Sequence, residues 1–262
     1  MDIVISIILG AVQGITEFLP VSSTGHLVIV GALLGRDANS FAFDVLLNIG
    51  TLAALVWYTR DRIRSIVAET IRRDYSLALK ILLGTIPAAI FGFFAEDIIA
   101  KLNDNIWLVA GMLVMVGFAM VFIREKPKGK GLIAGITYME ASLIGSAQML
   151  ALIPGTSRSG ITILAGLLLG LRSRVAAEFS FLLAIPIISG ATLKTLLSRR
   201  GYELLGDNFA EVMIGNLASF AVGLVAISAL LRVISSSDLK VFGVYRIALG
   251  AVLIILLSAN IL

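Results

Sequence analysis

Two stretches of the chain repeat one pattern: GAVQGITEFLPVSSTGHLVIVGALLG from Gly10 to Gly35, and GSAQMLALIPGTSRSGITILAGLLLG from Gly145 to Gly170. Aligned at an offset of 135 residues, they agree at Gly10/Gly145, Gln13/Gln148, Ser22/Ser157, Gly25/Gly160, Gly31/Gly166 and a final Leu-Leu-Gly. Each copy is an apolar segment broken in its middle by a proline and a group of hydroxyl side chains. A membrane tolerates a broken helix only where the freed backbone is buried or lines a cavity, so a matched pair of breaks predicts a binding site.

The composition is that of an integral membrane protein. Of the 262 residues, 58% are hydrophobic, against about 45–50% apolar residues in soluble domains, and the mean hydropathy is +1.00. Apolar runs that can span about 30 Å of hydrocarbon lie at 44–59, 77–95, 106–123, 178–197, 211–231 and 242–261. The sequence therefore predicts an all-α polytopic membrane protein with six transmembrane helices.

The two repeats are additional to these six segments. Pro20 and Pro154 split them into pieces too short to span the bilayer, so each repeat is predicted to be a re-entrant hairpin of two half-helices. No loop is long enough for a soluble domain, which leaves a single membrane domain over 1–262. Its predicted parts are a hairpin at 3–35 within a first repeat 1–124, the linker EKPKGKG from Glu125 to Gly131, and a hairpin at 131–171 within a second repeat 131–262.

The lysines and arginines predict the orientation, because short loops rich in these residues stay on the cytoplasmic side. If the first hairpin enters from outside, the cytoplasmic loops hold Arg60, Arg62, Arg64, Arg72, Arg73, Arg124, Lys126, Lys128, Lys130, Arg172, Arg174, Arg232 and Lys240. The outer loops then hold only Arg36, Lys101, Arg199 and Arg200. Both termini are expected outside. Since three crossings separate the hairpins, the repeats are inverted and their tips are expected to meet near the midplane.

This topology also accounts for the net charge of +4, so no nucleic-acid partner is expected. The segment 60–74 alternates isoleucine and valine with charged residues, a pattern typical of an amphipathic helix on the cytoplasmic interface. A solvated loop is the alternative interpretation of this segment. The chain has no cysteine, which excludes disulfides and thiol chemistry.

Each hairpin tip ends in hydroxyl residues that restart a helix. These residues are Ser22, Ser23 and Thr24 in the first tip, and Thr156, Ser157 and Ser159, with Arg158 among them, in the second. Serine and threonine are typical N-cap residues, and a helix N-terminus presents free N–H groups and a partial positive charge. Two such ends meeting from opposite sides predict a site for a multiply charged anion such as phosphate. Alternatively, the hydroxyls satisfy only the backbone freed by proline.

Arg158 favours the anion site. An arginine near the bilayer centre costs about 2.5–3.5 kcal/mol on insertion scales and indicates a functional site by default. Its guanidinium can bind two phosphate oxygens at once. A structural ion pair with Glu17 or Glu140 is the alternative, and both roles can coexist.

Glu17 and His26 flank the first tip, and His26 is the only histidine of the chain. It follows Ser23 by three residues on a restarting helix, which puts the two side chains on one face. A serine within reach of a histidine is a nucleophile–base arrangement, whereas a lone histidine is more often a packing residue. Glu17 is expected to bind a divalent cation or to position His26. Gln13 and its repeat partner Gln148 are expected either to line the site or to pack the hairpins.

The strings QGITEFLPVSSTGH, Gln13 to His26, and PGTSRSGIT, Pro154 to Thr162, resemble the paired signature of the bacitracin-resistance-type undecaprenyl-diphosphatases. The resemblance covers essentially the whole chain. It implies hydrolysis of undecaprenyl diphosphate to the monophosphate and phosphate on the outer face of the bacterial plasma membrane. That reaction recycles the lipid carrier of peptidoglycan synthesis, confers bacitracin resistance and uses a divalent cation, Mg²⁺ or Ca²⁺.

The family's site residues carry over one at a time. The first motif, an acid or Gln followed four residues later by Glu, falls on Gln13 and Glu17, and its hydroxyls and histidine fall on Ser22, Ser23 and His26. The serine, arginine and threonine of the second motif fall on Ser157, Arg158 and Thr162. Family members with a carboxylate at the first position differ from this chain, whose Gln13 is a weaker, neutral ligand. A metal site that requires two carboxylates here is therefore in doubt.

These residues give one main hypothesis. The diphosphate lies between the tips, bound by Arg158 and the helix N-termini, and the cation bridges it to Glu17. Ser23 is the expected nucleophile, assisted by His26, and direct attack by water would use the same residues. The rival hypothesis is a transporter or flippase of a lipid phosphate or small anion, because inverted broken helices are also a transporter design. The sequence leaves the oligomeric state open.

Overall fold

The computed structural model describes residues 2–35, 41–95, 102, 105–124, 129–236 and 239–259. Four of the basic residues used for the orientation, Arg36, Lys101, Lys126 and Lys128, lie outside these ranges. The helices are α1 (Ile3–Phe18), α2 (Ser23–Leu33), α3 (Phe41–Leu46), α4 (Asn48–Ile71), α5 (Ser76–Phe94), α7 (Ile106–Phe122), α8 (Tyr138–Gln148), α9 (Arg158–Leu168), α10 (Ser173–Leu197), α11 (Arg199–Asp207), α12 (Phe209–Ser236) and α13 (Lys240–Ser258). Two short 3₁₀ helices, η2 (Ile133–Gly135) and η3 (Met149–Leu152), flank α8, and the described residues contain no β-strand.

The predicted class, an all-α membrane protein, is confirmed. Within the described residues, five helical stretches are long and apolar enough to cross a membrane: Ala42–Ile71, Ser76–Phe94, Ser173–Leu197, Phe209–Ser235 and Lys240–Ser258. The sixth segment predicted to span, 106–123, forms α7 with 17 residues. At 1.5 Å per residue α7 is about 26 Å long, a little short of the hydrocarbon core.

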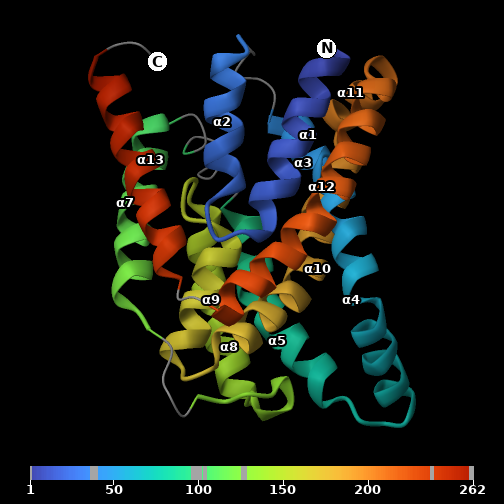
Figure 1. Ribbon diagram of the computed structural model, residues 1–262. Helices are drawn as coiled ribbons and strands as arrows, with labels where there is room; N and C mark the ends of the chain where they lie inside the picture. Colours follow the sequence, from blue (N-terminus) through green and yellow to red (C-terminus); the bar gives the residue numbers. More distant parts are fainter. Residues whose placement is uncertain are drawn as a thin grey trace.

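The two repeats form broken helices that enter the molecule from opposite ends. In Figure 1, α1 runs inward from the N-terminus to a turn in the middle of the molecule, and α2 returns toward the same end. The helices α8 and α9 lie in the other half of the view. The first break falls at Pro20, as predicted; in the second repeat α8 ends at Gln148 and η3 at Leu152, and the predicted Pro154 lies in the turn before α9. The cause is local, because proline lacks an amide hydrogen and disfavours the helical conformation of the residue before it.

Each hairpin packs against a long helix from the other half of the chain. The first hairpin helix, α1, packs on α12, and the first helix of the second hairpin, α8, packs on α5. The repeat-matched glycines Gly10 and Gly145 lie at these two crossings, where they face the backbones of Gly215 and Gly84. Small residues let helix backbones approach closely in membrane proteins. The first identity in the repeat therefore has a packing function.

Gly145→Ala is expected to destabilise the protein by about 1–3 kcal/mol, the usual cost of overpacking. The added Cβ would overlap the backbone of Gly84, which has no side chain that can move away. Gly190→Ala is the matched control, since nothing lies within 4 Å of a Cβ at that exposed position of α10. Thermal unfolding in detergent should show a lower midpoint for Gly145→Ala only. Equal midpoints for the two variants would contradict the close crossing.

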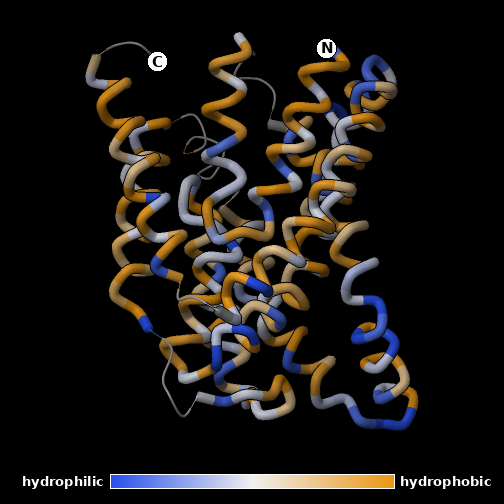
Figure 2. The backbone as a smooth tube through the Cα atoms, in the orientation of Figure 1, coloured by the Kyte–Doolittle hydropathy of each residue, from blue (hydrophilic) through white to orange (hydrophobic). Residues whose placement is uncertain are grey.

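Of the two expectations for the segment 60–74, the helix is confirmed as far as Ile71 and the solvated loop is wrong. The helix is not a new element, because α4 continues without a break to Ile71. The residues from Arg60 to Ile71 contain no proline or glycine and include good helix formers, so nothing in the sequence stops the helix. Figure 2 shows hydrophilic residues gathered along this end of α4, whereas the middle of the molecule is mainly hydrophobic.

Candidate active site at the two helix breaks

The two breaks have the same local backbone. Ser22 and Ser157 are the N-cap residues of α2 and α9, with left-handed φ angles of 76° and 75°. Each hydroxyl accepts a hydrogen bond from the amide of the glycine three residues later, at 3.3 Å from Gly25 and 3.2 Å from Gly160. The predicted capping by these serines is confirmed. A strained residue costs about 1–3 kcal/mol and is typical of functional sites, so matched strain at both tips indicates a site there.

An ion pair joins the two tips. The Arg158 Nη2 atom of α9 lies 2.8 Å from Glu17 Oε1 at the end of α1, and both side chains are only 11% exposed. Ser159 Oγ donates to the Leu19 carbonyl at 3.1 Å, a second link between the tips. Arg158 Nη1 also donates to the Ser180 carbonyl of α10 at 3.3 Å. The structural alternative for Arg158, a pair with Glu17, is therefore present, and it brings both tips to one place.

Glu17 is the centre of this cluster. Its Oε2 atom accepts hydrogen bonds from Ser23 Oγ at 2.8 Å and from Gln13 Nε2 at 3.1 Å. Gln13 Nε2 also donates to Asn48 Oδ1, the first residue of α4, at 2.7 Å. A hydroxyl that donates to a carboxylate is a nucleophile with its base in place. The arrangement can therefore transfer the Ser23 proton to Glu17 as the serine oxygen attacks.

The structure gives Ser23 a different partner from the one predicted. The His26 ring is engaged at both nitrogens elsewhere, with Nδ1 2.7 Å from the Ser22 carbonyl and Nε2 2.6 Å from the Tyr245 hydroxyl. Because a carbonyl only accepts, Nδ1 carries the proton and the Nε2 atom of a neutral ring accepts from Tyr245. The two rings are also stacked, with centroids 5.7 Å apart. The helical spacing brings Ser23 and His26 to one face, but the turn puts Glu17 against Ser23.

The other predicted site residues are hydroxyl and amide side chains, some with hydrogen-bond partners and some without. Ser157 Oγ lies 3.2 Å from Ser159 Oγ at the second tip, and Thr24 is half-buried at the start of α2. Thr162 Oγ1 is bonded to Ser180 Oγ at 2.7 Å and to its own helix, so its hydroxyl supports α9. Among the predicted site residues, four buried atoms have no hydrogen-bond partner within the described residues: both amide atoms of Gln148, the Thr156 hydroxyl and Gln13 Oε1.

Four further residues complete the cluster: Asn48, Ser180, Tyr245 and Arg246. Asn48 and Arg246 lie inside segments predicted to span the membrane, and the rule that singled out Arg158 applies equally to Arg246. That signal was available in the sequence. Tyr245 and Ser180 had no such signal, because a tyrosine and a serine are common in apolar helices and only the fold shows what they contact.

The residues around Glu17 carry oxygen atoms of the kind that bind a divalent cation. Mg²⁺ and Ca²⁺ prefer carboxylate and carbonyl oxygens, which Glu17, Gln13 and Asn48 supply. Gln13 Oε1 is buried without a partner among the described residues and belongs to the side chain that donates to Glu17, so it is available as a ligand. The described residues contain no cluster of three or more histidine, cysteine, aspartate or glutamate side chains. A cation here would have Glu17 as its only carboxylate ligand among these residues, so it would need further oxygens, such as those of the substrate phosphates.

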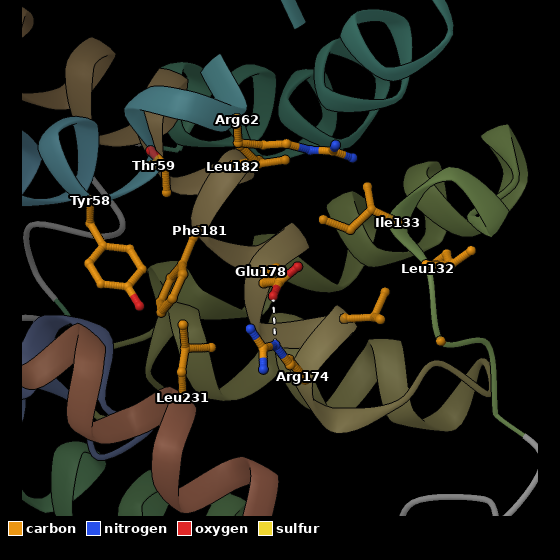
Figure 3. Close-up of a pocket in the computed structure, with 12 residues that line it drawn as sticks. Tyr58, Thr59, Arg62, Leu132, Ile133, Arg174, Glu178, Phe181, Leu182 and Leu231 are labelled. Carbon is orange, nitrogen blue, oxygen red and sulfur yellow. Dashed lines mark hydrogen bonds and ion pairs between the residues drawn. The ribbon is translucent and has the colours of Figure 1, made fainter. Parts of the chain in front are cut away.

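A pocket of about 360 Å³ lies away from the tips, between the ends of α4 and α10. Figure 3 shows its lining, which includes Arg62, Phe181 and the Arg174–Glu178 ion pair of 3.0 Å. None of the predicted site residues lines this pocket. It approaches the cluster only indirectly, since the Phe181 ring packs edge-on against Phe18, the neighbour of Glu17.

Fold and site together define a polytopic α-helical membrane protein with a half-buried carboxylate, hydroxyl, imidazole and guanidinium at two broken helices. The chain belongs to the family described as "Bacitracin resistance protein BacA", whose model matches residues 6–252. It is 39% identical over 269 residues to "Undecaprenyl-diphosphatase 1" of Pseudoalteromonas translucida, covering 98% of this chain and 100% of that protein. It is 40% identical over 255 residues to "Undecaprenyl-diphosphatase" of Caldicellulosiruptor bescii, covering 95% of each.

Proposed function

We propose that this protein hydrolyses undecaprenyl diphosphate to undecaprenyl phosphate and phosphate in the bacterial plasma membrane. The observation that carries the proposal is the contact of both tips at Glu17, which binds Ser23 from one tip and Arg158 from the other. The names of the relatives, undecaprenyl-diphosphatases, support the same substrate. The reaction would recycle the lipid carrier of peptidoglycan synthesis and confer resistance to bacitracin.

The site residues have distinct roles in this reaction. Arg158 and the N-terminal amides of α2 and α9 bind the phosphate oxygens and stabilise the charge on the transferring phosphoryl group. Glu17 takes the proton of Ser23 as the Ser23 oxygen bonds to the terminal phosphorus and the bond to undecaprenyl phosphate breaks. Water then releases phosphate from the serine. Direct attack by water, with Glu17 as its base, uses the same residues, and trapping a phosphoryl group on Ser23 would distinguish the two routes.

His26 completes the site as a positioned imidazole. The Ser22 carbonyl and the Tyr245 hydroxyl hold its ring at both nitrogens. Nε2 has one lone pair, which accepts from Tyr245, so His26 can take a proton from the attacking water only when the Tyr245 hydroxyl releases it.

The direct test is cation-dependent phosphate release from a polyprenyl diphosphate by purified protein. Release that depends on Glu17 and Arg158 supports the phosphatase. No release, together with counterflow of a lipid phosphate or anion in liposomes, would favour the rival transporter instead.

We further propose that Glu17 and Gln13 would hold a divalent cation, which would neutralise phosphate charge of the substrate. Gln13→Glu is expected to lower the Mg²⁺ or Ca²⁺ concentration needed for half-maximal activity by about tenfold, because added ligand charge raises cation affinity. The new carboxylate would replace an amide that already contacts Glu17. Titration of each cation into chelator-treated protein measures the change. A cation-induced rise in melting temperature, larger in Gln13→Glu, is the readout independent of activity, and identical titrations would refute the assignment.

The proposed topology has six crossings and two re-entrant hairpins in inverted repeats, 1–124 and 131–262, with both termini and the active site toward the outer face. The reciprocal packing of α1 on α12 and α8 on α5 supports it, as does the distribution of basic loops. Because the chain has no cysteine, single cysteines can be introduced without background labelling. A membrane-impermeant maleimide added to intact cells should label Ser258→Cys and not Asp74→Cys. The reverse pattern would contradict the orientation.

A further inference from the structure

Arg246 of α13 is the largest fully buried side chain of the described residues, with 0% exposure. Within the described residues, all of its hydrogen bonds go to backbone carbonyls. The acceptors are Gly155 at 2.7 Å, Thr156 at 3.1 Å, Pro20 at 3.2 Å, and Met112 and Leu113 at 3.4 Å.

These carbonyls come from both breaks. Pro20 lies in the turn between α1 and α2, and Gly155 and Thr156 lie in the turn before α9. A broken helix leaves carbonyls without a partner one turn later, and such groups are costly to bury unless something donates to them. A guanidinium has five donors in a rigid plane, so it can bind acceptors from several segments at once. One side chain thus connects the two tips and ties them to α7 and α13.

None of the hydrogen-bond partners of Arg246 among the described residues is a carboxylate. Burying a charge in this way is expensive, and the carbonyl dipoles offset only part of the cost. At the tips, Glu17 and Arg158 neutralise each other. The guanidinium of Arg246 therefore adds net positive charge beside the two tips, where the diphosphate would bind. Its complete burial keeps it from touching the substrate.

We propose that Arg246 is a positioning residue of the reaction, which holds the first tip against the second so that Ser23, Glu17 and Arg158 keep the geometry of phosphoryl transfer. A test of this proposal by kcat rests on the proposed function. A test by hydrogen–deuterium exchange does not, so failure of the positioning role and failure of the proposed function can be told apart.

The activity test compares Arg246→Met and Arg246→Lys with Lys80→Met. Lys80 is a matched control, because it is also a buried cation that donates to a backbone carbonyl, that of Ala134 at 3.2 Å, away from both tips. Displacement of catalytic groups by about 1 Å can cost 100-fold in rate, so Arg246→Met should lose about 100-fold in kcat. KM should change by less than about threefold, since Arg158 still binds the phosphates. Lys80→Met should keep the kcat of the wild type.

Arg246→Lys separates positioning from charge. The lysine ammonium keeps the charge but lacks the planar fork that reaches both tips, so this variant should recover no more than about a tenth of wild-type kcat. Full recovery would show that charge alone matters and would overturn the proposal. Wild-type kcat in Arg246→Met would overturn it as well.

Hydrogen–deuterium exchange tests the same proposal without substrate. Arg246→Lys should increase exchange of the tip amides, at Ser22 to Gly25 and at Ser157 to Gly160, while α5 keeps its protection. If Arg246→Met does not fold, hydrogen–deuterium exchange of Arg246→Lys still tests whether Arg246 positions the tips. Unchanged exchange at both tips would contradict the proposal, even if activity is lost.

Discussion

Glu17→Gln is expected to reduce phosphate release by about 10³-fold or more, within the range that loss of a general base gives. The glutamine has nearly the same shape, so the tips can still meet. It cannot take the proton that Ser23 donates to Oε2 at 2.8 Å. It is also a poorer ligand for a cation, and it leaves the 11% exposed Arg158 guanidinium without its anion. The substitution therefore removes a general base, a cation ligand and the anion that pairs with Arg158, all of which are the Glu17 carboxylate.

The measurement is kcat of purified variant that elutes as the wild type does in size-exclusion chromatography. Glu140→Gln is the matched control, because Glu140 is a carboxylate of 14% exposure with its own ion pair of 2.8 Å, to Lys130. Burial raises the pKa of Glu140, but hydrogen bonds from Lys130 and Thr137 outweigh it and hold the pKa below its ordinary value. Glu140 forms the capping box at the start of α8 with Thr137, whereas the tips lie at the other ends of the hairpins. Its variant should lose stability and keep its kcat.

A Glu17→Gln protein with kcat within tenfold of wild type would remove Glu17 from the centre of the mechanism. Loss of kcat in both variants would indicate a general effect of neutralising an ion pair.

Arg158→Lys is expected to lower kcat/KM by about 10³-fold, although the charge is kept, because arginine clamps on a transferring phosphoryl group contribute about this much. The guanidinium divides its donors between Glu17 at 2.8 Å and the Ser180 carbonyl at 3.3 Å, and its plane is held for the substrate. A lysine can satisfy one of these acceptors and has no fixed plane.

Arg174→Lys is the control for Arg158→Lys, since Arg174 also pairs with a glutamate, Glu178, but in the pocket away from the tips. It should leave kcat/KM unchanged. The inorganic phosphate concentration that inhibits release is a second measurement, and it should rise only in Arg158→Lys. Equal kcat/KM in Arg158→Lys and Arg174→Lys would mean that Arg158 does not bind the substrate phosphate.

Short-range features were predictable. The breaks at Pro20 and Pro154 and the caps at Ser22 and Ser157 follow from local chemistry, because proline ends a helix and a hydroxyl begins one. Even the strained φ of Ser22 and Ser157 recurs at the two repeat-related positions. The helix predicted in the segment 60–74 is also a local feature, and it continues α4 because a hydropathy change does not end a helix that lacks a stop signal.

The sequence did not predict the hydrogen-bond partners of the site residues. The spacing of Ser23 and His26 is a property of one helix, but their hydrogen bonds go to Glu17 across the turn and to Tyr245, 219 residues away. Likewise, hydropathy places Arg246 in a membrane segment without saying that its acceptors belong to both tips.

Residue order alone was enough for the class of protein, the positions of the two breaks and the set of side chains that the tips bring to them. The fold in three dimensions decided which groups those side chains contact: Glu17 contacts Ser23 and Arg158, and His26 contacts Tyr245. It also added Arg246, which donates to the tip carbonyls. The reason is one of range. Helix breaks and caps depend on neighbours within a few residues, whereas a hydrogen bond requires atoms about 3 Å apart, and here distant segments supply them.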